Sequence, residues 1–115
     1  MRVLAVVDDL VFQSKIQGAA APGVEVRIAK TLAQAQAASS EAVIVIIDLG
    51  LGSADPMEII RTLHAQHPAV TIIGYGSHVE TELLAQAKIA GCTTVLPRSA
   101  LVQQLLHLLV PRQLK

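Results

Sequence analysis

Ala42-Val43-Ile44-Val45-Ile46-Ile47-Asp48 is the stretch of this chain that decides its fold. Residues 42–47 are six apolar residues, five of them β-branched, and the run is too short to span a bilayer. Such a run is typical of a parallel strand that is buried on both faces of a sheet. Asp48 follows directly, and Gly50 and Gly52 allow the chain to turn. Because open α/β sheets bind ligands at the carboxyl ends of their strands, Asp48 is the first candidate functional residue.

The composition favours a single layered α/β domain. A length of 115 residues suits one domain spanning residues 1–115. Hydrophobic residues make up 52% of the chain and aromatic residues 2%, so the predicted core consists of aliphatic side chains, as in sheets that are covered on both faces. The scarcity of aromatic side chains disfavours a surface that stacks on nucleic-acid bases.

Charge and cysteine content narrow the class of protein further. The chain has nine basic and nine acidic residues, so no overall field favours nucleic acid or an anionic membrane. Cys92 is the only cysteine and cannot form an internal disulfide. The N-terminus lacks the apolar core of a secretory signal, and no apolar run approaches the roughly 20 residues of a spanning helix. These features predict a soluble, cytoplasmic protein.

The whole chain alternates predicted strands with predicted helices. The predicted strands cover residues 2–7, 24–29, 42–47, 70–74 and 93–96, and the predicted helices cover 10–20, 31–39, 55–66, 79–90 and 100–110. Asp55 followed by Pro56 is typical of a helix start, and Gly91 of a helix end. Tyr75-Gly76-Ser77 is predicted to form a loop. Strands and helices that alternate in this way predict a doubly wound parallel sheet with right-handed crossovers.

Acidic residues follow two of the predicted buried strands. Asp8 and Asp9 come after the first strand, and Asp48 comes after the third. Because the ends of these strands lie side by side at the switch point of such a sheet, the three carboxylates are predicted to converge. Their mutual repulsion requires a cation or a proton to neutralise them. A hard divalent ion such as Mg²⁺ suits carboxylate oxygen, and no histidine adjoins these acids to favour zinc.

This set of residues resembles the receiver domain of bacterial two-component response regulators. The resemblance covers essentially the whole chain and rests on Asp8-Asp9, Asp48, Asp55-Pro56-Met57-Glu58 and Ala90-Gly91. It implies a flavodoxin-like (βα)₅ three-layer sandwich with a five-stranded parallel sheet in the order 2-1-3-4-5.

The resemblance also implies roles for individual residues. It makes Asp48 the acceptor of a phosphoryl group from a histidine kinase or a phosphotransfer protein. It makes Asp8, Asp9 and Asp48, together with the backbone carbonyl of Gly50, the ligands of Mg²⁺. The chemistry agrees, since a carboxylate can attack phosphorus when a metal neutralises the developing charge. The signal would then pass to a downstream protein partner by docking.

Three departures from the receiver pattern predict an atypical member. Receivers place a serine or threonine where this chain has Gly76, and Ser77 comes one position later. They place a lysine followed by proline where this chain has Arg98 and Ser99, and Val95 replaces an aromatic switch residue. Arginine keeps the charge but is a planar fork, so Arg98 is predicted either to contact a phosphoryl oxygen or to pair with one of the acids.

The predicted function is therefore a stand-alone signalling module, not an enzyme in the ordinary sense, that binds Mg²⁺ and accepts phosphate on Asp48. One alternative is a pseudo-receiver, an interaction module that works without phosphorylation. Another is a small Mg²⁺-dependent phosphohydrolase, which is disfavoured because these loops show no evident substrate pocket or general acid. The last predicted helix carries more apolar residues than one core face needs, which predicts a homodimer through that face or, alternatively, a deeply inserted helix.

Overall fold

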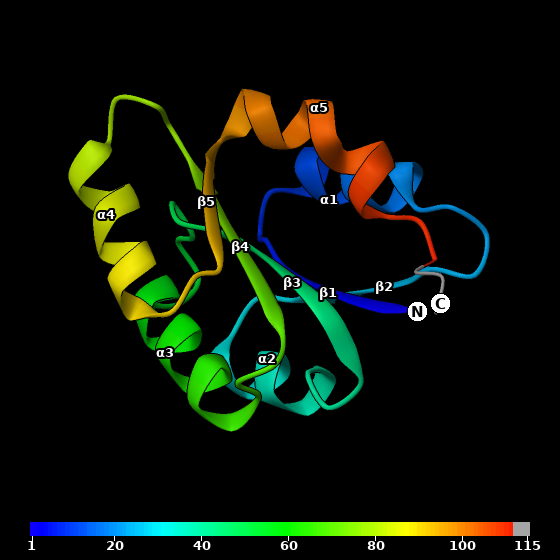
Figure 1. Cartoon of the computed structure of the whole chain (residues 1–115), viewed down its shortest axis with the longest axis horizontal. Coiled ribbons are helices and arrows are strands. Elements are labelled where there is room, and N and C mark those ends of the chain that lie inside the picture. Colours follow the sequence, from blue (N-terminus) through cyan, green and yellow to red (C-terminus); the bar gives the residue numbers. More distant parts are fainter. Residues whose placement is uncertain (112–115) are drawn as a thin grey trace.

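A computed structural model describes residues 1–111, which form a parallel sheet with helices on both faces (Figure 1). The strands are β1 (Arg2–Val6), β2 (Glu25–Ala29), β3 (Ala42–Asp48), β4 (Thr71–Gly76) and β5 (Thr94–Pro97). The helices are α1 (Leu10–Ala19), α2 (Leu32–Ala38), α3 (Pro56–Gln66), α4 (Thr81–Ala90) and α5 (Arg98–Leu108). All neighbouring strands pair in parallel, in the order β2-β1-β3-β4-β5. The predicted flavodoxin-like sandwich and its strand order are confirmed.

The central strand β3 divides the core into two halves. Helices α1 and α5 cover one face of the sheet, and α2, α3 and α4 cover the other (Figure 1). Ile44 and Ile46 pack with the α1 and α5 side, whereas Val45 and Ile47 pack with the opposite side. This is the alternation of a strand, and each of these four side chains is at most 1% exposed. An uninterrupted β-branched run suits β3 because both of its faces are buried. None of the helices formed by residues 1–111 has the length and apolar character needed to cross a membrane.

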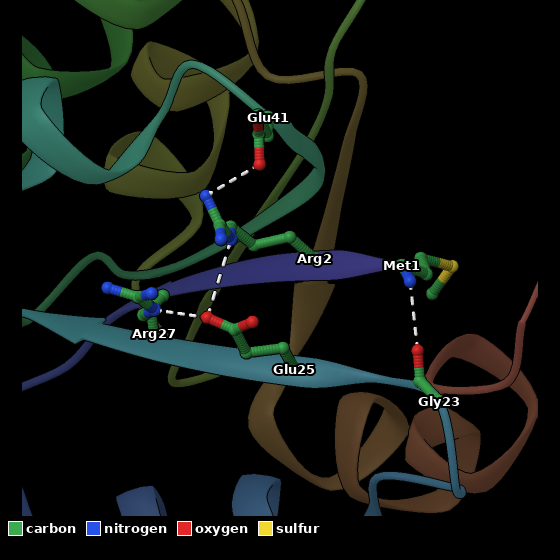
Figure 2. A network of polar contacts seen from close by, with 6 residues as sticks. All are labelled: Met1, Arg2, Gly23, Glu25, Arg27 and Glu41. Atoms are coloured by element: carbon green, nitrogen blue, oxygen red, sulfur yellow. Dashed lines mark hydrogen bonds and ion pairs between the residues drawn. The ribbon is translucent and has the colours of Figure 1, made fainter.

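A network of charged groups ties together the amino ends of the first three strands (Figure 2). The Arg2 guanidinium lies 3.0 Å from the Glu41 carboxylate and 3.5 Å from that of Glu25. Arg27 also donates a hydrogen bond to Glu25, and this bond is the main reason why the pKa of Glu25 is lowered. Ion pairs as exposed as these contribute little to the free energy of unfolding. They connect β1 to β2 and to the residue before β3. The network lies at the opposite edge of the sheet from the acids that follow β1 and β3.

Strand β4 extends further than the sequence predicted. Tyr75 and Gly76, predicted to lie in a loop, belong to the strand, where Tyr75 pairs with Asp48 of β3 and Gly76 pairs with Pro97 of β5. The glycines suggested a turn, but the strand is held between two partners. Glycine at position 74 instead provides space, because a Cβ there would lie 3.1 Å from a methyl carbon of Leu49.

The elements around β5 also begin at other residues than predicted. Helix α4 begins at Thr81 rather than at Val79, which is 71% exposed in the preceding loop. Val79 shares the helical spacing of Leu83, but this position precedes the first turn of α4. Strand β5 runs one residue later than predicted, and α5 follows it directly. Arg98 therefore lies in the first turn of α5 rather than in a connecting loop.

Candidate functional site at the carboxyl edge of the sheet

Asp48 is the last residue of β3, and its side chain is only 5% exposed. Its Oδ1 atom accepts a hydrogen bond from the backbone N–H of Gly50 at 2.8 Å. The backbone of the same turn is closed by a bond from the Leu51 N–H to the Asp48 carbonyl at 3.1 Å. The turn after β3 therefore holds one carboxylate oxygen in place and leaves the other for a ligand.

The electrostatic surroundings of Asp48 raise its pKa. Burial is the largest cause, and the negative charges of Asp8 and Asp9 act in the same direction. The hydrogen bond from Gly50 and the positive charge of Arg98 partly oppose this rise. Two acids that follow β1 and one arginine of α5 thus act on a single buried carboxyl group at the end of β3.

Asp8 and Asp9 also have local structural roles. Asp8 accepts hydrogen bonds at 3.0 Å from the backbone N–H groups of Gly52 and Ser53, and so ties the loop after β3 to the end of β1. Asp9 caps α1 by accepting from the N–H groups of Val11 at 2.9 Å and Phe12 at 3.4 Å. Each of these carboxylates uses one oxygen in these bonds, and the second oxygen is available.

The donor chemistry of this edge fits a magnesium ion. No three acidic, histidine or cysteine side chains within residues 1–111 are already grouped as a metal site. Mg²⁺ does not need such a group, because it keeps several waters and usually takes only one or two carboxylates from the protein. The repulsion that raises the pKa of Asp48 is also the interaction that a bound cation would offset.

A cavity of about 670 Å³ opens beside Asp48, between the loops that follow β3 and β4 and the first turns of α5. Its walls include the apolar side chains of Leu83 and Val102. The polar residues of the lining are Asp48, Ser77, His78, Glu80, Arg98, Ser99 and Gln103, and the backbone of Gly50 also borders the cavity. Gly76 also lines it, whereas Asp8 and Asp9 do not. The sequence showed no evident pocket in these loops, and that expectation was wrong because helices α4 and α5, and not the loops alone, supply its walls.

Arg98 lies over two aromatic rings instead of an acid. Its guanidinium carbon is 5.8 Å from the ring centre of Tyr75 and 5.9 Å from that of Phe12. These rings are stacked with their centres 4.6 Å apart. Within residues 1–111 the ion pairs involve Arg2 and Arg27, and Arg98 forms none. A guanidinium held over aromatic faces keeps its charge beside Asp48 without neutralising it.

Position 76 carries no hydroxyl, and the hydroxyl of Ser77 belongs to the loop before α4. Gly76 is buried, and a Cβ there would touch Leu84 at 3.6 Å and Leu49 at 3.7 Å. Ser77 lines the cavity, but its Oγ atom accepts a hydrogen bond from the Val79 N–H at 3.4 Å within the loop. The switch hydroxyl is therefore displaced by one position, and Ser77 uses its oxygen as an acceptor in the turn before α4.

The fold resembles solved structures of response regulator receiver domains. The receiver domain of NtrX from Brucella abortus superposes with a TM-score of 0.80 at 21% identity, over 92% of each chain. A CheY-like receiver domain protein from Methanospirillum hungatei gives a TM-score of 0.78 at 21% identity, over 92% of this chain and 87% of that one. A response regulator from Burkholderia pseudomallei, solved with a phosphorylated aspartic acid, calcium and citrate, gives 0.75 at 24% identity, over 94% of this chain and 65% of that one.

These likenesses define the class of fold. No protein-family model and no curated protein sequence matches the chain. The chain spans only 25% of the longer NtrX structure, so it corresponds in extent to one module of that regulator. The protein therefore has the CheY-like fold of receiver domains, which are signalling modules.

Proposed function

We propose that the protein is an atypical receiver module that accepts a phosphoryl group on Asp48. The observation that carries this proposal is the environment of Asp48, a carboxyl group that is 5% exposed at the end of the central strand and borders a cavity with Arg98 at its rim. A buried carboxyl group with a raised pKa costs stability in its charged form, and such groups gather at functional sites.

The chemistry would be a displacement at phosphorus. The Oδ1 atom of Asp48 is held by Gly50, so the other oxygen, Oδ2, is the nucleophile. A bond forms between this oxygen and phosphorus while the bond to the leaving group breaks, and the electron pair leaves with the imidazole of a phosphohistidine or with acetate. The predicted ligand set of Asp8, Asp9, Asp48 and the Gly50 carbonyl would hold Mg²⁺ directly through one or two of its carboxylates and through water for the others. The ion would supply positive charge that offsets the negative charge of the phosphoryl oxygens.

The remaining residues of the chain would position and stabilise the group. The Gly50 N–H keeps the Asp48 carboxylate oriented, and Arg98 supplies the positive charge that receivers obtain from lysine. Arg98 is the first residue of α5, so a movement of its side chain toward a phosphoryl group would pull on the first turn of that helix. Val102 and Leu106 of α5 are 38% and 68% exposed, and this apolar face is our candidate for homodimerisation or for docking a protein partner.

Incubation with acetyl phosphate and Mg²⁺ tests the proposal directly. Intact-mass spectrometry is expected to show one added phosphoryl group on the wild type and none on Asp48→Asn. Asp55→Asn is a matched control, because Asp55 only caps α3 and asparagine caps equally well, so this variant should be phosphorylated normally. An unmodified wild-type mass under these conditions, with the protein folded, would contradict the proposal.

The alternative of a pseudo-receiver is favoured by one observation, the lack of a hydroxyl at position 76, which is a buried glycine. It predicts that a partner protein binds the wild type and Asp48→Asn with equal affinity, with or without acetyl phosphate. An isothermal titration in which phosphorylation changes the affinity about tenfold, or about 1.4 kcal/mol, would exclude it.

A phosphohydrolase role, for which the cavity gives room, would instead require steady turnover of a phosphate ester. The expected cytoplasmic location stays a prediction.

A further inference from the structure

Tyr75 carries a hydroxyl group that is buried beside the site and has no partner. Its side chain is 0% exposed, and its hydroxyl oxygen forms no hydrogen bond within the described part of the chain. Burying a hydroxyl without a partner costs free energy, and such groups are rare enough in folded proteins to need an explanation. The two glycines that flank Tyr75 are typical of a loop, so this residue was not among the predicted site residues.

The sheet register places this hydroxyl next to Asp48. Tyr75 and Asp48 are paired across β4 and β3, and paired residues of parallel strands project from the same face. Tyr75 packs with α1 and α5, which makes this the face that Asp48 shares. The two groups are close enough for the Asp48 carboxylate to act on the Tyr75 hydroxyl both through its charge and through a hydrogen-bonding approach, and both effects raise the pKa of Tyr75. This approach does not meet full hydrogen-bond geometry, so the hydroxyl remains without a satisfied partner.

The ring of Tyr75 is held firmly. It stacks on Phe12 at 4.6 Å between ring centres, with 20° between the ring planes, and the Arg98 guanidinium covers it at 5.8 Å. Burial, and secondarily the charge of Asp48, raises the pKa of Tyr75, so the hydroxyl keeps its proton at neutral pH. The group is therefore a fixed hydrogen-bond donor beside a nucleophile.

We propose that the Tyr75 hydroxyl donates a hydrogen bond to the phosphoryl group on Asp48, taking the place of the hydroxyl that is missing at Gly76. Tyr75, which precedes Gly76 in β4, would supply the donor from the face of the sheet that α1 and α5 cover. This inference rests on the proposed function of Asp48, and it explains why an unpartnered hydroxyl is retained there.

The test uses the fact that Tyr75 is the only tyrosine and that the chain has no tryptophan. Near-ultraviolet difference absorption therefore reports on this hydroxyl with no other phenol or indole in the spectrum. The protein is titrated with beryllofluoride, a phosphoryl mimic, in the presence of Mg²⁺. We expect a red shift of the tyrosine band in the wild type, as the hydroxyl begins to donate, and no shift in Asp48→Asn.

Tyr75→Phe is the decisive variant. It keeps the ring stacked on Phe12 and removes only the unpartnered hydroxyl, so it should be at least as stable as the wild type in thermal unfolding without ligand. Its affinity for beryllofluoride, followed by amide chemical shifts, is expected to fall about tenfold or more. A purely structural role for the hydroxyl would not produce this combination.

The possible results separate the two proposals. If the wild type binds beryllofluoride but Tyr75→Phe binds it equally well and the tyrosine band does not move, the role of Tyr75 is wrong and the receiver function stands. If the folded wild type takes neither beryllofluoride nor phosphate on Asp48, both proposals are wrong.

Discussion

Asp48→Asn is expected to make the metal-free protein more stable than the wild type at neutral pH and to abolish its stabilisation by Mg²⁺. The carboxylate of Asp48 is buried and repelled by Asp8 and Asp9, and asparagine keeps its shape without the charge. The oxygen of the asparagine amide can still accept the hydrogen bond from the Gly50 N–H. The measurement is urea unfolding of both proteins with a chelator present, at several pH values.

The sign of the pH dependence follows from the raised pKa. In the folded protein the Asp48 carboxyl holds its proton more tightly than in the unfolded chain. The stability that protonation gives is fully present below the unfolded pKa of about 3.9 and is lost as the pH rises through the higher folded value. The wild type should therefore lose stability relative to Asp48→Asn over this acidic range, by about 1.4 kcal/mol for each unit of pKa difference.

Magnesium should reverse this loss in the wild type. A ligand that binds only the folded state at about 100 times its dissociation constant adds about 2.7 kcal/mol to the free energy of unfolding. Asp55→Asn should respond to Mg²⁺ like the wild type, since Asp55 bonds only the first turn of α3. Equal stabilisation of Asp48→Asn, or an Asp48→Asn protein less stable than the wild type at neutral pH, would contradict the expected role of this carboxylate.

The sequence predicted the elements whose residues interact locally or alternate strictly. The run that forms β3 could be recognised because a short stretch rich in β-branched residues is typical of a strand buried on both faces. Asp55 with Pro56 marked the start of α3 because capping needs only neighbouring residues. The strand order required the resemblance to receivers, since local patterns do not determine which strands become neighbours.

Features that depend on distant contacts could not be predicted. Tyr75 was placed in a loop, because only the pairing of β4 with both β3 and β5 makes it part of a strand. The position of Arg98 over Phe12 and Tyr75 depends on the packing of α1 against α5, which sequence spacing does not contain. The hydrogen bonds from Gly52 and Ser53 to Asp8 were missed for the same reason.

Gly91→Ala is expected to be the most destabilising small substitution in the chain. Gly91 ends α4 with φ at +133°, a conformation that residues with a Cβ rarely adopt. An added Cβ would also lie 2.7 Å from Cγ and 2.8 Å from Cβ of His64 on α3, well inside van der Waals contact. The backbone strain costs about 1 to 2 kcal/mol and the overlap about 1 to 3 kcal/mol. Chemical unfolding should therefore show a loss of about 2 to 5 kcal/mol.

Two further variants separate these causes. Gly18→Ala is the matched control, because Gly18 lies within α1 and a Cβ there would meet no atom within 4 Å. That change should stabilise the protein by up to about 1 kcal/mol, since alanine favours helix. In a His64→Ala background, Gly91→Ala should cost less, because two of the three atoms nearest the new Cβ are removed. If the cost is the same in both backgrounds, the His64 ring contributes nothing, and backbone strain with the remaining contact to Cβ of residue 64 explains why glycine joins α4 to β5.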